Sequence, residues 1–378
     1  MSKPKILLLD QYSQIGGGQR IFVDLAQIFK RANFDLTLAY PHGGELEALI
    51  DEKFGNLLAQ VEIKSPYLNA GAKTLKDFWS MLIYFFYFLR FRSLLQRHDY
   101  VYVNGSRLFL PVWFLSFFVK AKFIYHVHLN HSLLEKTFIR LIESAPHTAY
   151  LIVNSNFVYR ELVKFDSIFE ASPRVVLIEN TLSETFSDLP FINRFNDEQT
   201  DPMYIAVIGR VSPEKGQAIL LKIAPLFPNT AFFVIGDSDF TDAQYLNELK
   251  RAEISNIIFA GKVSDIKEAI DELRIQVSLV PSTWDEPFGL VAIESMANSC
   301  LTIVSAKGEL PHIAQETGAM VYETEENLTM MIESLLQTPR SKLKEQAYLQ
   351  HYKTIEHYHY RRFEAMILSL FKLANSSD

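Results

Sequence analysis

Short apolar runs alternate with amphipathic stretches along most of the chain. In the first forty residues, an apolar run at Lys5–Leu9 is followed by a glycine-rich turn, a helical pattern at Gln19–Arg31 and a second apolar run at Asp35–Tyr40. Apolar runs of this length are typical of strands that are buried on both faces. Strands of this kind that alternate with helices predict a βαβ unit at the start of the chain.

The same alternation continues in two series. In the first series, further strands are predicted at Tyr100–Val103, Phe123–Val127, Tyr150–Val153 and Arg174–Ile178. In the second series, strands are predicted at Tyr204–Ile208, Ala231–Ile235, Ile257–Ala260, Ile275–Val280 and Leu301–Val304. Because helical segments separate these strands, we predict two doubly wound α/β domains, each built on a parallel sheet that is covered on both faces.

The periodic pattern fails between the two series, where Pro190 and Pro202 bracket a polar segment. Such a segment is typical of a linker between domains, and 378 residues exceed what one core usually organises. We therefore predict a first domain over residues 1–185, a linker over 186–202, a second domain over 203–352, and a C-terminal helix over 353–378 that crosses back to the first domain.

Composition narrows the class of protein. With 48% hydrophobic and 21% charged residues, the chain has enough apolar surface to fold, and its formal net charge of −7 argues against nucleic acid as a partner. Cys300 is the only cysteine, which excludes an intrachain disulfide and a metal site built from several thiolates. The chain shows neither a secretory signal nor an apolar run of the ~20 residues that span a bilayer, so we expect a cytoplasmic protein.

The strand predicted at Tyr204–Ile208 ends in a loop with two cations. The loop, Gly209–Gly216, reads GRVSPEKG and contains Arg210 and Lys215. In open α/β sheets, ligands bind beyond the carboxyl ends of the strands, where these two side chains are expected. A guanidinium and an ammonium group there suit a diphosphate, and two solvated cations in an ordinary loop are the alternative.

A second motif follows the strand predicted at Ile275–Val280. It reads PSTWDEPFGLVAIE over Pro281–Glu294, and Pro287 is suited to the first turn of a helix. Glu286 would then lie just ahead of the helix. Glu294 would lie two turns further on nearly the same face, either as a solvated surface residue or as a buried carboxylate that accepts hydrogen bonds from sugar hydroxyls. The backbone N–H groups expected to be free for phosphate or sugar oxygens are those near Phe288, Gly289 and Leu290.

These two motifs, with seven residues between the two glutamates, resemble those of the retaining nucleotide-sugar glycosyltransferases of family 4, the glycosyl transferases group 1. The turn Gly16–Gly18 is similar to the N-terminal loop of that family, His128 to its active-site histidine, and Val176–Asn180 to the strand before its interdomain linker. The resemblance extends over nearly the whole chain. It implies the GT-B fold, in which two Rossmann-like domains face a cleft.

The resemblance implies a role for each matching residue. The residues implied in donor binding are Gly17, Gly18, Gly209, Arg210, Lys215, Glu286, Phe288, Gly289, Leu290 and Glu294. Arg210 and Lys215 would hold the diphosphate, Glu286 would contact the transferred sugar, and Glu294 would bind the ribose hydroxyls. The residues implied in catalysis are Glu286, His128, Arg210 and Lys215, and the neighbouring His126 and His131 are alternatives to His128.

The implied function is that of a metal-independent, retaining hexosyltransferase that needs no cofactor. Such an enzyme would move a sugar from a UDP- or GDP-linked donor to a glycan or a polyprenyl-linked acceptor. The expected process is the synthesis of a bacterial surface polysaccharide, such as O-antigen, lipopolysaccharide or capsule. A non-catalytic nucleotide-sugar-binding scaffold of the same fold and a GT-B hydrolase or epimerase are the alternatives.

The chain departs from the family pattern at Gly308–His312, which reads GELPH where a Gly-Gly-x-Pro-Glu turn is usual. This difference concerns the identity of the donor more than the class of reaction. Asp237-Ser238-Asp239 matches the Asp-x-Asp signature of metal-dependent glycosyltransferases, but a match of three residues is frequent by chance. The resemblance implies no metal, because Arg210, Lys215 and a helix N-terminus already supply positive potential.

The segment over residues 78–97 is both aromatic and basic. Residues 78–125 contain 17 aromatic side chains, and residues 73–122 contain eight basic residues against two acidic ones. A core helix of the first domain is one interpretation. The alternative is that a face with Phe85, Phe88 and Phe91, flanked by Arg90, Arg92 and Arg97, rests on an anionic surface at the inner face of the plasma membrane.

Overall fold

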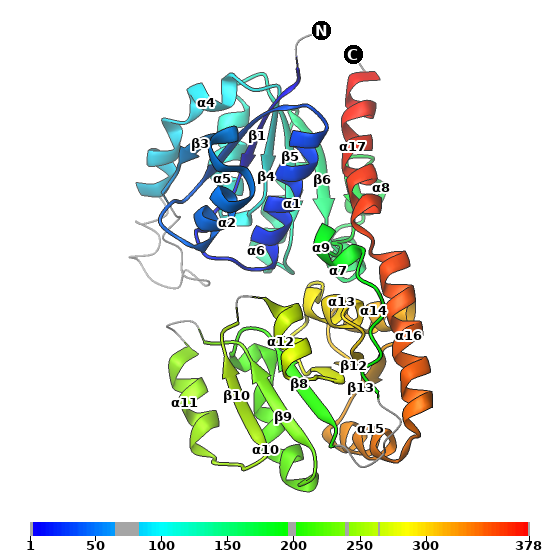
Figure 1. Ribbon diagram of the computed structural model, residues 1–378. Coiled ribbons are helices and arrows are strands. Elements are labelled where there is room, and N and C mark those ends of the chain that lie inside the picture. The colour runs from blue at the N-terminus through cyan, green and yellow to red at the C-terminus, as the bar shows by residue number, and fades with distance from the viewer. Residues whose placement is uncertain (1–2, 65–82, 196–201, 239–241, 264, 377–378) are drawn as a thin grey trace. The chain divides into compact units, whose positions relative to one another are not determined.

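The computed structural model describes residues 3–64, 83–195, 202–238, 242–263 and 265–376 (Figure 1). The chain forms two compact units: unit 1 comprises Met1–Asn180 with Arg361–Asp378, and unit 2 comprises Thr181–Tyr360. Both units are Rossmann-like α/β folds on parallel sheets, as predicted. Within the described residues, none of the helices has the length and apolar character needed to cross a membrane.

Unit 1 is built on a sheet with the strand order β3-β2-β1-β4-β5-β6-β7, in which all neighbours are parallel. The strands are β1 (Lys5–Leu9), β2 (Asp35–Tyr40), β3 (Ala59–Glu62), β4 (Tyr100–Val103), β5 (Lys122–Val127), β6 (Thr148–Val153) and β7 (Val175–Leu177). The pattern predicted every strand of this sheet except β3. That strand lies at the edge of the sheet and is only partly buried, so it lacks the apolar run of a central strand.

The helices of unit 1 cover both faces of this sheet (Figure 1). Their bounds are α1 (Gly17–Arg31), α2 (Glu45–Phe54), α4 (Arg92–Gln96), α5 (Phe109–Ser116), α6 (Leu133–Ser144), α7 (Asn156–Phe165), α8 (Ile168–Ala171) and α17 (Tyr360–Ser376). Alternate residues of β4 point to opposite faces of the sheet. Val101 and Val103 join the core cluster with α5 and α6, whereas the Tyr102 ring packs at 6.0 Å from Phe29 of α1 and the Tyr100 ring at 4.9 Å from Phe371 of α17.

The aromatic segment packs inward for the most part. Residues 83–89 are helical, and residues 78–82 of the predicted segment lie outside the described residues. Tyr84, Phe88 and Leu95 are buried in the core cluster against β4 and β5, and Phe91 packs against that cluster. The core interpretation is therefore confirmed for these side chains. The hypothesis of an exposed face is wrong for Phe88, because the sheet needs an apolar cover and this buried ring supplies part of it, whereas Phe91 is partly buried.

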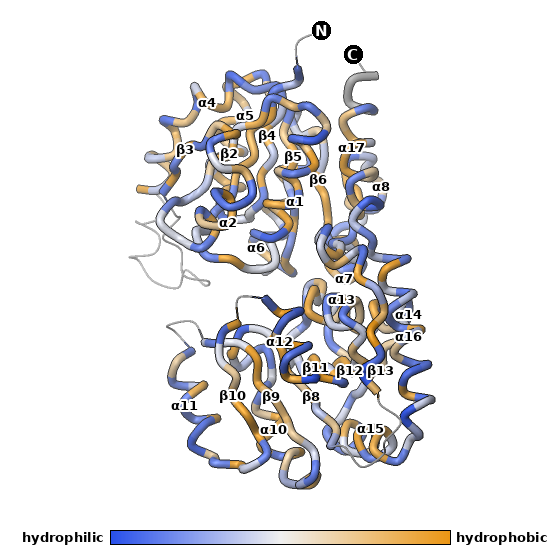
Figure 2. Tube along the Cα trace, viewed as in Figure 1, coloured by the Kyte–Doolittle hydropathy of each residue, from blue (hydrophilic) through white to orange (hydrophobic). Residues whose placement is uncertain are grey.

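Unit 2 is built on a second parallel sheet, with the strand order β10-β9-β8-β11-β12-β13. The strands are β8 (Tyr204–Ile208), β9 (Ala231–Ile235), β10 (Ile257–Gly261), β11 (Val277–Val280), β12 (Leu301–Ser305) and β13 (Met320–Tyr322). The pattern missed β13, a short edge strand with two partly buried side chains. Strand β9 is fully apolar, which is visible as the hydrophobic colour along it in Figure 2.

The helices of unit 2 are α9 (Glu184–Ser187), α10 (Leu220–Ile223), α11 (Ala243–Arg251), α12 (Ile266–Glu272), α13 (Leu290–Ala297), α14 (Leu310–Thr317), α15 (Glu325–Gln337) and α16 (Arg340–His357). Hydrophobic and hydrophilic colours alternate along α11 and α16 in Figure 2, as expected for helices with one packed face. Carboxyl ends of parallel strands lie at one edge of the sheet, so the loops after β8, β9, β11 and β12 share that edge.

The chain passes from unit 1 to unit 2 between Asn180 and Thr181, ahead of the linker predicted at residues 186–202. The segment before residue 196 packs on unit 2: the N–H of Leu182 donates to the Tyr358 carbonyl at 3.0 Å, and the N–H of Ile192 donates to the Ser299 hydroxyl at 2.9 Å. The predicted C-terminal helix is interrupted between α16 and α17, and the chain returns to unit 1 at Arg361.

Candidate functional site

The loop after β8 carries the two predicted cations and is fixed by its neighbours within unit 2. The N–H of Val211 donates to the Asp237 carbonyl at 2.9 Å, which holds the loop to the end of β9. The side-chain amide of Gln217 donates to the Arg210 carbonyl at 2.8 Å. Arg210 itself is exposed, with its backbone held in place on both sides. The loop therefore presents the Arg210 guanidinium from a main chain that hydrogen bonds hold in place.

The loop after β8 is joined directly to the loop after β11. Gly216 has φ +73°, and a Cβ there would lie 1.9 Å from the Pro281 carbonyl oxygen, so only glycine permits this approach. The N–H of Thr283 donates to the Glu214 carbonyl at 2.9 Å, and its hydroxyl donates to the Pro213 carbonyl at 2.9 Å. The two sequence motifs thus form one continuous surface.

Lys215 and Glu286, one from each motif, form an ion pair. The Lys215 Nζ lies 2.9 Å from both carboxylate oxygens of Glu286. The carboxylate also accepts a hydrogen bond from the Ser282 hydroxyl at 2.8 Å and from the Trp284 indole N–H at 3.1 Å. Glu286 is buried, and three donors satisfy its charge. The structure therefore brings together two residues that were predicted to contact the same nucleotide-sugar donor.

Glu214 is an additional acidic residue at this edge that the sequence analysis did not assign. It lies between the two cations in the loop. The pKa of its carboxyl is lowered by its own backbone N–H first, and then by the Ser212 side chain and the charges of Arg210 and Lys215. An ionised Glu214 reduces the positive potential that these two cations create. Its position between them in the sequence was the available signal.

Helix α13 begins later than the sequence predicted. Its first residue is Leu290, with Gly289 as the N-cap, so Pro287 lies outside the helix rather than in its first turn. Glu286 and Glu294 consequently do not share a helix face. Glu294 is buried, which decides against the solvated alternative.

The side chain of Phe288 is part of the hydrophobic core of unit 2. The ring is buried in the cluster that includes Ala292, Ile293 and Leu310. Its backbone, with those of Gly289 and Leu290, leads into the first turn of α13, where N–H groups have no partner within the helix. Of these residues, only the main chain can therefore make the predicted contacts with phosphate or sugar oxygens.

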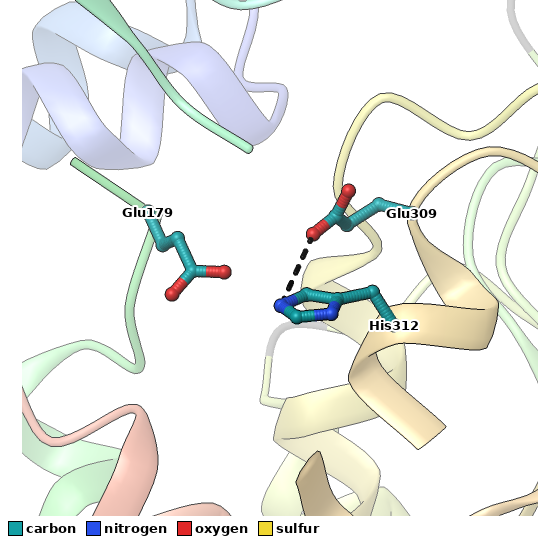
Figure 3. Close-up of side chains that lie close together, drawn as sticks. All are labelled: Glu179, Glu309 and His312. Atoms are coloured by element: carbon teal, nitrogen blue, oxygen red, sulfur yellow. Dashed lines mark ion pairs between the residues drawn. The ribbon is translucent and has the colours of Figure 1, made fainter. Parts of the chain in front are cut away.

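The segment that departs from the family pattern lies directly beside Glu286. Gly308 has φ +59°, and a Cβ there would lie 2.1 Å from the Glu286 carbonyl oxygen. The N–H of Glu309 donates to that same carbonyl at 2.8 Å. The Glu309 carboxylate is buried and lies 3.9 Å from the His312 ring, as Figure 3 shows. This turn therefore positions Glu286 through its backbone and adds a buried acid next to it.

The candidate Asp-x-Asp motif lies partly outside the described residues, because Asp239 is among those not described. Asp237 is exposed, and its carboxylate accepts a hydrogen bond from the Ser238 N–H at 2.8 Å. Glu179, which Figure 3 also draws, belongs to unit 1, where it accepts a hydrogen bond from Asn156 at 2.9 Å.

Unit 1 has a buried polar network at the carboxyl edge of its own sheet. Asp10, directly after β1, is fully buried and accepts hydrogen bonds from the Asn104 amide at 2.7 Å, the Gln19 amide at 2.9 Å and the Tyr12 N–H at 2.9 Å. Burial raises the pKa of this carboxyl from 3.8 to about 6, against the opposing effect of these hydrogen bonds. Sequence analysis missed Asp10, although a lone acid directly after an apolar strand was a usable signal.

His128 is part of this network. Its Nε2 lies 2.8 Å from the Asn104 amide oxygen, whereas its Nδ1 is buried without a hydrogen-bond partner among the described residues. Burial, and secondarily the nearby His131, lowers the pKa of His128 to about 3, so the ring is uncharged at neutral pH. A Cβ on Gly18 would lie 3.8 Å from the His128 ring, which shows that the predicted glycine turn and histidine meet.

The glycine turn also differs in one respect from the prediction. Helix α1 begins at Gly17 rather than Gln19, so Gly17 and Gly18 form its first turn. The Gly18 carbonyl accepts a hydrogen bond from the Asn104 amide at 2.8 Å. These two glycines thus combine an exposed helix N-terminus with a direct link to the His128 network.

The alternative histidines lie in different surroundings. The His126 ring centre is 4.0 Å from that of His128, but its Nδ1 is 2.9 Å from the Tyr102 hydroxyl on the face of the sheet covered by α1. Burial lowers the pKa of His126 well below its usual range. His131 is paired with Glu135 at 3.5 Å. Of the three, His128 is the one joined to the glycine turn.

Comparisons with known proteins show similarity to glycosyltransferases. Residues 190–350 match the family described as Glycosyl transferases group 1. An uncharacterized glycosyltransferase of Methanocaldococcus jannaschii is 30% identical over 133 residues, and a phosphatidyl-myo-inositol mannosyltransferase of Mycobacterium tuberculosis is 29% identical over 106 residues. These matches cover 33% and 27% of this chain and the same shares of the two relatives, so the chain matches a third or less of their length.

The similarity in structure extends over the whole chain. The crystal structure of HepE from Anabaena, in complex with UDP and glucose, superposes with a TM-score of 0.80 at 17% identity and covers 98% of this chain and 99% of HepE. At this identity the likeness establishes the fold. The chain therefore has the two Rossmann-like units of the GT-B glycosyltransferase fold, with a second unit that matches the glycosyl transferases group 1.

Proposed function

We propose that the chain is a retaining, metal-independent glycosyltransferase that takes its sugar from a nucleoside-diphosphate sugar. The observation that carries the proposal is the convergence of Arg210, Lys215 and Glu286 on two loops that are joined at the carboxyl edge of one sheet. These loops lie within the region that matches Glycosyl transferases group 1. The HepE structure, which contains UDP and glucose, supports a nucleotide sugar as the donor.

The proposed reaction exchanges one bond at the anomeric carbon for another. The bond between this carbon and the departing phosphate oxygen breaks, and the acceptor hydroxyl oxygen bonds to the carbon on the same face. The hydroxyl proton passes to the departing phosphate. Arg210 and Lys215 stabilise the negative charge that develops on the diphosphate, and Glu286 accepts hydrogen bonds from the sugar hydroxyls.

The proposed acceptor is a glycan or a polyprenyl-linked glycan of a bacterial surface polysaccharide. A lipid-bearing acceptor is supported by the similarity to a phosphatidyl-myo-inositol mannosyltransferase, whose name describes transfer to a lipid. We assign the donor to unit 2, where the cations lie, and the acceptor to unit 1.

Product analysis with a panel of UDP- and GDP-sugars and candidate acceptors tests this function. We expect release of the nucleoside diphosphate and a glycoside with the anomeric configuration of the donor. Arg210→Ala should lose at least about 100-fold in kcat/KM, because it removes charge stabilisation at the leaving group. Arg251→Ala, which alters an exposed arginine of α11, is the matched control and should retain activity. Free sugar as the main product would identify a hydrolase, and binding without turnover would identify a scaffold.

We also propose that the chain binds a membrane surface. The side chains that would contact the lipid differ from those expected from the sequence. Ile83 and Phe86 are 68% and 65% exposed, and Phe117 and Phe118 are 47% and 49% exposed. Arg92 joins the two segments, because its guanidinium donates to the Phe118 carbonyl at 3.2 Å and lies over the Phe118 ring.

The charge around these rings supports an anionic lipid surface. Residues 83–134 contain six arginines and lysines and one acidic residue, Asp99, in a chain whose formal net charge is −7. Exposed Arg90 and Lys120 flank the aromatic rings. Basic residues beside exposed apolar rings are the features by which a protein binds at the interface of an anionic bilayer.

Vesicle cosedimentation tests the membrane proposal. We expect binding to phosphatidylglycerol vesicles, weaker binding to phosphatidylcholine, and a loss of about tenfold or more in the variant Phe86→Ser with Arg90→Glu. Leu226→Ser, at a leucine of unit 2 that is 58% exposed, should bind like the wild type. Equal recovery with both lipids, unaffected by the double substitution, would overturn the proposal.

A further inference from the structure

One buried polar atom of unit 1 is left without a partner by the fold. The Nδ1 of His128 has no hydrogen bond among the described residues, although the other ring nitrogen is held at 2.8 Å by Asn104. A buried polar atom without a hydrogen bond costs free energy, so a site that keeps one is suited to receive a partner from a ligand. Whether that partner must donate or accept depends on which nitrogen carries the ring proton.

The orientation of the Asn104 amide decides the location of that proton. Its Nδ2 donates to two acceptors, the Asp10 carboxylate at 2.7 Å and the Gly18 carbonyl at 2.8 Å. The reversed orientation would place the amide oxygen against both of these oxygens, which is unfavourable. The Asn104 oxygen therefore faces His128, and it can only accept a hydrogen bond from a protonated Nε2.

Asp10 holds this arrangement in place. Besides Asn104, it accepts hydrogen bonds from the Gln19 side chain and the Tyr12 N–H, both at 2.9 Å. An ionised carboxylate has no proton to give, so it requires the NH₂ group of Asn104 and not its oxygen. The sequence of contacts from Asp10 through Asn104 to His128 thus leaves the lone pair on Nδ1.

We infer that Asn104, which Asp10 orients, is the positioning residue that fixes this tautomer of His128, so that Nδ1 can only accept a hydrogen bond from a ligand, as from a hydroxyl group. A phosphate or carboxylate oxygen has no proton to give and is rejected at this atom. The ligand class is a polyhydroxy compound. Its identity as the sugar of the donor or acceptor rests on the proposed function, whereas the tautomer is a property of the protein alone.

Nitrogen-15 NMR of the histidine rings tests the positioning role in the full-length protein. We expect His128, assigned by the signals that disappear in His128→Gln, to carry its proton on Nε2, with slow exchange of that proton. Asn104→Leu removes the acceptor and should speed the exchange by about tenfold or more. Asn154→Leu is the matched control, because the Asn154 amide donates to the main-chain carbonyl of His128 at 3.2 Å and not to its ring. Circular dichroism establishes that each variant is folded.

Glycerol supplies hydroxyl donors without a nucleotide and is the probe for the binding role. It should shift the Nδ1 signal of wild-type His128, whereas 1,2-dimethoxyethane, which has acceptors only, should not. A proton on Nδ1, or equal responses to both compounds, would overturn the inference. If the chain transfers no sugar but His128 behaves as described, the proposed function fails and this inference stands.

Discussion

The two units place their candidate sites at the same edge of similar sheets but with opposite electrostatic character. In unit 2, Lys215 and Glu286 form an ion pair, and three donors satisfy the carboxylate. In unit 1, His128 is uncharged, and one of its ring nitrogens has no partner among the described residues. The first arrangement suits a diphosphate with its sugar, and the second suits a neutral hydroxyl. We therefore assign two kinds of recognition to one fold, and local residues determine the difference.

The largest expected effect concerns the charged site of unit 2, formed by Arg210, Lys215 and Glu286. Glu286→Gln keeps the size of the side chain but removes the negative charge that Lys215 contacts at 2.9 Å. We expect kcat/KM for transfer to fall by about 100-fold to 1,000-fold, because sugar positioning fails, while the affinity for the nucleoside diphosphate is kept or increased by the unneutralised Lys215. Steady-state kinetics and calorimetry measure the two effects. Glu345→Gln, at an exposed glutamate of α16, is the control. A parallel loss of affinity and turnover in Glu286→Gln would contradict the assignment.

The next effect tests whether the charged site depends on the contact between its two loops. Gly216→Ala places a Cβ where the Pro281 carbonyl now lies, so the loops must separate. We expect the free energy of unfolding to fall by about 3 kcal/mol, from left-handed strain and the displaced loop together. Denaturant titration measures the loss. Gly261→Ala, at φ +75° with nothing within 4 Å of the added Cβ, isolates the strain and should cost about 1 kcal/mol. Equal losses would show that the contact is unimportant.

The smallest expected effect concerns the neutral site of unit 1, formed by His128 and Asn104. It is the pH dependence of Asp10, whose carboxyl group holds Asn104. The pKa of Asp10 is raised from 3.8 to about 6 by burial, so the folded state holds the proton more tightly than the unfolded chain. The stability of the protein relative to Asp10→Asn should therefore increase as the pH falls from 7 to 4, by about 2 kcal/mol. Denaturant titrations of both proteins across this range measure the difference. A constant difference, or one of opposite sign, would refute a buried Asp10 of this kind.

Much of the fold follows from local patterns, because the central parallel strands are mostly apolar runs. The edge strands β3 and β13 escaped prediction, since β3 reads AQVE and has no apolar run, and β13 has only three residues. The second motif was found from its residue types, but the start of α13 at Leu290 was not, because Gly289 adopts a left-handed conformation that the pattern does not reveal.

The site residues that sequence analysis missed depend on contacts between distant positions. Asp10 and Asn104 are 94 residues apart, and their hydrogen bond exists because β1 and β4 are neighbours in the sheet. Glu309 comes beside Glu286 in the same way, through the close approach of Gly308 to the Glu286 backbone. Residue types predicted the individual side chains, whereas the strand order determines which of them meet.

The difference between the two sites is tested most directly by the affinity for a nucleoside diphosphate. Isothermal titration with UDP and with GDP compares the wild type, Arg210→Ala and Asn104→Leu. For whichever of the two compounds binds the wild type, Arg210→Ala should weaken binding by about 10-fold to 100-fold, because it removes a charged hydrogen-bond donor. Asn104→Leu should weaken binding by less than about threefold, because it removes no charge from the two loops of unit 2. Equal losses in the two variants, or no loss in Arg210→Ala, would contradict the account.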